Sequence, residues 1–151
     1  MSTAVQRAIA YFRTMGMTEQ PNEYGSIAFL IGLGGRKYGL ALVPEDDGQA
    51  LTFMVSDGNG TRMRVTDALR NAVNERNAGG LMGVWSVNAQ DGLRFIICAP
   101  QEPDGPSERA MTHYLQCILV ELRDMSTIVD ALGVRFGQPI RADDNGVRVR
   151  R

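Results

Sequence analysis

Residues Ser107 to Leu132, SERAMTHYLQCILVELRDMSTIVDAL, determine much of the architecture of this chain. Ser107 is a favoured N-cap residue and Gly133 follows the last apolar position, so the segment predicts one helix of roughly 25 residues, about 38 Å long. Its apolar residues alternate at intervals of four and three, which is typical of a seam that packs against a helix or a sheet. The seam consists of Met111, Leu115, Ile118, Leu122, Met125, Val129 and Leu132.

A second apolar row widens this helix beyond one seam, because Gln116 is the only polar residue from Tyr114 to Val120. A helix that is apolar on more than one side must be covered on more than one side, and one sheet covers only one. Two sources of cover remain open, namely a partner, or the N-terminal helix together with the C-terminal segment. On the first interpretation the partner-binding residues are Met111, Tyr114, Leu115, Ile118, Leu119, Leu122 and Met125.

The rest of the chain predicts two shorter helices and five strands. Apolar spacing indicates a helix over residues 3–15 and another that follows the N-cap residue Thr66. Residues 26–34, 37–43 and 50–56 favour a three-stranded meander, in which Gly34-Gly35 forms a two-residue turn. Residues 81–89 and 93–99 favour a second hairpin around Asp91-Gly92, and the prolines of 100–106 predict a surface loop.

These elements predict an α+β fold in the order α-βββ-α-ββ-α, with the antiparallel sheet packed against the helices. Residues 1–137 form the predicted single domain, and residues 138–151 form a polar C-terminal tail. Val147 and Val149 alternate with arginines, so an alternative use of the tail is to add a strand to the sheet edge of a neighbouring molecule.

Composition excludes several classes of protein. Hydrophobic residues make up 44% and charged residues 22% of 151 residues, which is the balance of a globular domain. The formal net charge of -1 gives no overall attraction for nucleic acid or anionic lipid. The longest apolar run, Ile27 to Leu33, is too short to span a membrane. The first residues lack the features of a secretory signal, so we expect a cytoplasmic protein in which Cys98 and Cys117 are reduced and buried.

Catalytic chemistry has little to build on in this sequence. His113 is the only histidine, and Cys117 follows it by one helical turn, but no third group nearby would orient the pair. Residues 32–37 lack the Gly-Lys-Ser/Thr ending of a phosphate-binding loop, and a calcium loop starting at Asp57 has Ala68 where a glutamate is needed. We therefore predict no catalytic residue, no cofactor and no metal, and a protein that is not an enzyme; the less favoured alternative, the Cys-His hypothesis, is an enzyme that uses Cys117 and His113.

The order of the elements, together with Asn77-Ala78-Gly79-Gly80-Leu81-Met82-Gly83-Val84-Trp85, resembles the YbjN family and the type III secretion chaperone-like fold. The resemblance covers residues 3–137. It implies a homodimeric, non-enzymatic protein-binding module that binds a segment of a protein client. The resemblance implies no catalytic residues in this chain. The glycine-rich first hairpin and the arginine-ending tail depart from that pattern. An alternative hypothesis is a structural subunit of a larger assembly that uses the tail as an arm.

Overall fold

The computed structural model describes residues 3–17, 19–20, 27–45, 50–57, 63–80, 82–100, 105–140 and 147–148. Residues 101–104 of the predicted surface loop at 100–106, and much of the predicted tail, lie outside the described residues. The helices are α1 (Thr3–Thr14), α2 (Asp67–Asn77) and α3 (Glu108–Ala131). The strands are β1 (Glu19–Gln20), β2 (Ile27–Leu33), β3 (Arg36–Glu45), β4 (Ala50–Ser56), β5 (Val84–Asn88), β6 (Gly92–Ala99), β7 (Gln138–Pro139) and β8 (Val147–Arg148).

The main strands form one antiparallel sheet in the order β1-β2-β3-β4-β6-β5. The hairpin of β5 and β6 adds to the meander of β2, β3 and β4 through β6, which pairs with β4 from Leu51↔Ala99 to Val55↔Phe95. The predicted α+β class and antiparallel sheet are confirmed, and the structure adds the two-residue strands β1, β7 and β8 to the predicted order.

The first hairpin turns at the two glycines that the sequence indicated. Gly34 and Gly35 have φ angles of 60° and 77°, as a primed two-residue turn requires. The turn holds β2 and β3 in register from Ile27↔Leu42 to Leu33↔Arg36. Side chains of alternate residues therefore point to opposite faces of the sheet along both strands.

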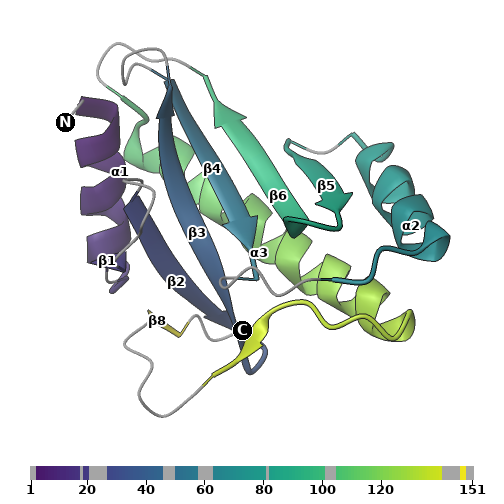
Figure 1. Cartoon of the computed structure of the whole chain (residues 1–151). Coiled ribbons are helices and arrows are strands. Elements are labelled where there is room, and N and C mark those ends of the chain that lie inside the picture. Colours follow the sequence, from purple (N-terminus) through teal and green to yellow (C-terminus); the bar gives the residue numbers. More distant parts are fainter. Residues whose placement is uncertain are drawn as a thin grey trace.

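All three helices pack on one face of the sheet, which we call the inner face. In Figure 1 helix α3 crosses behind the strands, with α1 at one end of the sheet and α2 at the other. Phe12 of α1 stacks against Phe29 and Phe53 of the sheet, with ring centroids 5.1 and 6.3 Å away, and Phe53 in turn stacks against Tyr114 of α3. These contacts join both layers in one apolar core.

Helix α3 is continuous, as predicted, and its N-cap is Ser107, whose side chain accepts a hydrogen bond from the Ala110 N–H at 3.1 Å. In the described part of the chain no helix is both long enough and apolar enough to cross a bilayer.

Two pieces of the predicted tail belong to the sheet. Strand β7 pairs with β3 at Arg36 and Lys37, and β8 runs parallel to β2 at Ile31 and Gly32. Val147, which the alternative interpretation placed in a strand added to a neighbour's sheet, therefore pairs with the sheet of its own chain. Residues 141–146 and 149–151 of the predicted tail lie outside the described residues.

The passage from α2 to β5 is fixed by side-chain and backbone contacts. The Asn77 carboxamide donates to the Trp85 carbonyl at 2.8 Å and accepts from the Trp85 N–H at 2.7 Å, so it binds the outer edge of β5 as a paired strand would. Gly83 lies so close to β6 that an added Cβ would approach the Ile96 carbonyl oxygen to 2.5 Å. Asn77 and Gly83 both belong to the segment 77–85, on which the family resemblance is based.

We predict that Gly83→Ala destabilises the fold by roughly 1–3 kcal/mol, because the backbones of β5 and β6 must separate to admit the methyl group. Gly79→Ala is the matched control, since its Cβ would lie 3.3 Å from the Arg76 carbonyl oxygen and requires a smaller adjustment. Urea unfolding measures both variants, and equal losses would show that the close approach of Gly83 is unimportant.

Candidate functional site

The residues predicted to bind a partner lie in the core of the chain. Met111, Tyr114, Leu115, Ile118, Leu119, Leu122 and Met125 are all buried, and none is more than 7% exposed. They therefore do not form an exposed docking surface, and this prediction is corrected: the chain covers them itself, by the inner face of the sheet and by α1.

Contacts on either side of α3 show how this covering is achieved. Tyr11 of α1 donates a hydrogen bond to Thr112 at 3.0 Å. The segment after α3 folds back, so that Phe136 stacks on Tyr38 and on Trp85, with ring centroids 5.1 and 5.8 Å away. Of the two sources of cover left open by the sequence, α1 and the C-terminal segment are the ones observed.

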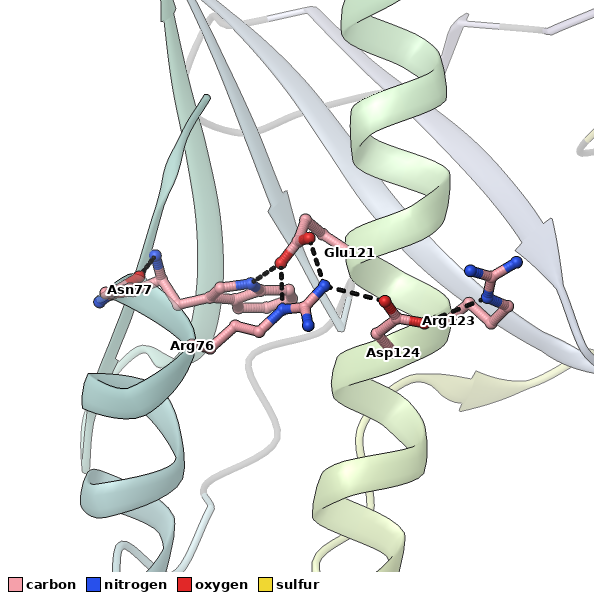
Figure 2. Close-up of polar contacts among 6 residues, drawn as sticks. Arg76, Asn77, Glu121, Arg123 and Asp124 are labelled. Carbon is pink, nitrogen blue, oxygen red and sulfur yellow. Dashed lines mark hydrogen bonds and ion pairs between the residues drawn. The ribbon is translucent and has the colours of Figure 1, made fainter. Parts of the chain in front are cut away.

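Glu121 is the one charged residue in the core among the described residues, and three elements converge on it (Figure 2). It accepts hydrogen bonds from Arg76 of α2, at 2.9 Å from Nε and 2.6 Å from Nη2, and from the indole Nε1 of Trp85 at 2.9 Å. Arg76 also binds Asp124 at 2.8 Å. The hydrogen bond to Glu121 raises the pKa of the Arg76 guanidinium. This cluster fixes α2, α3 and β5 relative to one another.

We predict that Glu121→Gln destabilises the fold by roughly 2–3 kcal/mol, because the amide directs N–H groups at a guanidinium or an indole that also donates. Asp124→Asn is the control; its side chain is 33% exposed and makes one bond to Arg76, so the expected loss is below about 1 kcal/mol. Urea denaturation compares the two, and a loss for Glu121→Gln no larger than the control's would contradict the assigned role.

A small groove lies beside this cluster and contains His113 and Cys117, the pair that nucleophilic catalysis would use. It has a volume of about 250 Å³ and is lined by Met82, Phe95, His113, Gln116, Cys117, Val120 and Glu121. His113, Cys117 and Glu121 succeed one another at intervals of four residues, so they form one row along α3. A more open hollow of about 930 Å³ shares His113 and Gln116 and extends to the start of the helix.

This row lacks the electrostatics of a nucleophilic site. Burial and the nearby Glu121 carboxylate raise the pKa of the Cys117 thiol, which disfavours the reactive thiolate. Glu121 is already held by Arg76 and Trp85, so it is not available to orient His113. Among the described residues no three His, Cys, Asp or Glu side chains are grouped so that they could hold a metal ion.

We predict that iodoacetamide modifies Cys98 faster than Cys117 in the native protein at pH 7–8. Cys98 is exposed, contrary to the expectation that both thiols are buried, whereas Cys117 is half-buried and its raised pKa lowers the thiolate fraction at any given pH. Mass spectrometry of timed samples gives both rates. Preferential labelling of Cys117 would indicate an activated thiol and reopen the Cys-His hypothesis.

The face of the sheet that points away from the helices, which we call the outer face, also carries apolar residues. None of the three helices lies on it (Figure 1). The register places five apolar residues side by side, one on each strand from β2 to β5, and we call them the central row. In spatial order they are Ala28, Ala41, Met54, Ile96 and Val84.

The central row is accessible and has largely apolar neighbours. Val84 is 47% exposed, and the other four residues are half-buried. Leu30, Val43, Ala50, Thr52 and Cys98 belong to the same face by alternation along their strands. The sequence carried a signal of this face, since Ile27 to Leu33 is apolar at every position, as in a strand covered on both sides. That signal was overlooked.

The edges of the sheet are less open than this face. Strands β1 and β8 pair with the outer side of β2, and Asn77 occupies the backbone groups of Trp85 on the outer side of β5. A strand added directly to β2 at these positions, or to β5 at Trp85, would have to displace these groups.

Comparison with family models, with curated proteins and with solved structures found no match to this chain.

Proposed function

We propose that this chain is a non-enzymatic, chaperone-like protein-binding module whose docking surface is the outer face of its sheet. The observation that carries the proposal is the central row, an unbroken line of apolar residues across five strands that no helix covers. Contiguous exposed apolar patches on a folded domain mark sites of interaction. A homodimeric binding module is also what the resemblance to the YbjN family implies.

The shape of the outer face favours a protein as its partner. Small-molecule sites are concave and enclose most of their ligand. The hollows found beside α3 are open, and one contains the thiol with the raised pKa. A broad sheet face is better suited to an extended or folded polypeptide, because a polypeptide can bury a large surface area without entering a cavity. Met54, near the centre of the row, has the flexible side chain that adaptable binding surfaces use.

The test uses a permanently unfolded probe, reduced and carboxymethylated α-lactalbumin. We predict that the wild-type chain binds this probe and that Met54→Glu weakens binding at least tenfold, because a carboxylate at the centre of the row must lose its water when the face is covered. Binding is measured by fluorescence anisotropy of the labelled probe. Met54 is half-buried at the surface, so the substitution leaves the inner core unchanged.

The control is Gln116→Glu, which adds the same charge at an exposed position of α3 on the other side of the molecule. It should bind the probe as the wild type does. Wild-type protein that fails to bind at concentrations up to about 100 μM, or equal weakening by the two substitutions, would exclude the outer face as a client surface.

A further inference from the structure

We propose that the small groove beside α3 binds one cuprous ion, Cu(I), between the sulfur of Cys117, the thioether of Met82 and the imidazole of His113. All three residues line this groove, together with Phe95 of the inner face of the sheet. The groove therefore lies on the helix side of the sheet and is separate from the outer face. The inference goes beyond the proposed function and does not depend on it.

The two residues of α3 have the spacing of a ligand pair on a helix. His113 and Cys117 are four residues apart, so their side chains lie on one face of the helix with their Cβ atoms about 5–6 Å apart. The two histidines that bind zinc from a single helix have the same interval. His113 is exposed and Cys117 is half-buried, so a metal can reach the pair directly from solvent.

Met82 supplies the third donor. Glu121 is the next residue of the same helical row, but its carboxylate is bound by Arg76 and Trp85 (Figure 2). Met82 borders the groove from the passage before β5 and is 47% exposed, so its flexible thioether can adjust to a metal. We predicted no metal from the sequence, in which Met82 lies far from the α3 residues, and the fold brings it to the same groove.

The donor set selects a soft ion. Thiolate and thioether ligands favour Cu(I), whereas a structural Zn²⁺ site takes four ligands from cysteine, histidine and carboxylate groups. Among the described residues no such group of three His, Cys, Asp or Glu side chains exists, so the thioether decides which metal fits. Phe95 and Val120 add apolar walls, which suit a soft ion that accepts few ligands and little water.

Binding requires the loss of one proton and no change of oxidation state. A bond forms between copper and Sγ of Cys117, the thiol proton passes to water, and copper stays Cu(I). Burial and the Glu121 carboxylate raise the pKa of this thiol, but a coordinated metal deprotonates a thiol outright. The negative charge of Glu121, which opposes a bare thiolate, attracts a cation placed at the same sulfur.

The test is competition for Cu(I) with bicinchoninate, using the full, reduced chain without oxygen. Transfer of the ion to the protein lowers the absorbance of the coloured chelate. Cys98→Ser leaves Cys117 as the only thiol, and we expect this chain to take up one equivalent. Adding Met82→Leu or His113→Gln to it should weaken binding at least about tenfold, because losing even a group that only orients a ligand costs roughly 10–100-fold.

Met15→Leu in the same single-thiol chain is the matched control. Met15 is 46% exposed, almost as much as Met82, but it follows α1 and does not line the groove. It should leave the affinity unchanged. X-ray absorption at the copper edge should show two sulfur ligands in the parent chain and one in Met82→Leu. Near-ultraviolet circular dichroism confirms that each variant is folded.

Three results would overturn the inference. They are a parent chain that takes no Cu(I) from bicinchoninate, equal affinities for Met82→Leu and Met15→Leu, which would indicate binding by a lone thiol, and displacement of Cu(I) by an equal concentration of Zn²⁺. None of them affects the proposed function, because the Met54→Glu test concerns the outer face. Equally, a chain that binds no unfolded probe can still bind Cu(I) in this groove.

Discussion

The burial of α3 against a single face of the sheet governs the rest of this structure. The helix is apolar around much of its circumference, so one layer cannot cover it, and α1 and the segment around Phe136 close its flanks. All three described helices therefore pack on the inner face of the sheet. None of the described helices covers the apolar residues on the opposite side of the sheet, and the proposed function rests on this asymmetry.

Much of the fold could be predicted because its signals are local. The helical spacing from Ser107 to Leu132, the glycine turn at Gly34-Gly35 and the hairpin near Gly92 each depend on a few neighbouring residues. The docking surface depends on non-local pairing. Ala28, Ala41, Met54, Ile96 and Val84 are unremarkable in sequence and form a row only when the register of five strands is known. For the same reason the sequence left open whether a partner or its own chain covers the excess apolar surface of α3, and the structure shows that its own chain does.

Glu121, the buried charged residue of the described core, joins three elements of the fold. Glu121 shares a helical row with His113 and Cys117, and in isolation that row resembles the start of a catalytic constellation. Its carboxylate is bound by Arg76 and Trp85, and it contributes to the raised pKa of the Cys117 thiol. A buried ion pair is weak evidence for stability, and we expect its main effect here to be on how α2, α3 and β5 are placed relative to one another.

The Asn77 carboxamide has a consequence for how the molecule behaves when crowded. By occupying the peptide groups of Trp85 it caps the outer side of β5 at that residue, and beyond β2 the sheet continues only into the two-residue strands β1 and β8 among the described residues. Copies of this protein are thus hindered from joining edge to edge, the route by which sheet proteins polymerise into fibrils. An edge-to-edge contact at Trp85 would have to displace the Asn77 carboxamide, which disfavours growth of the sheet in that direction.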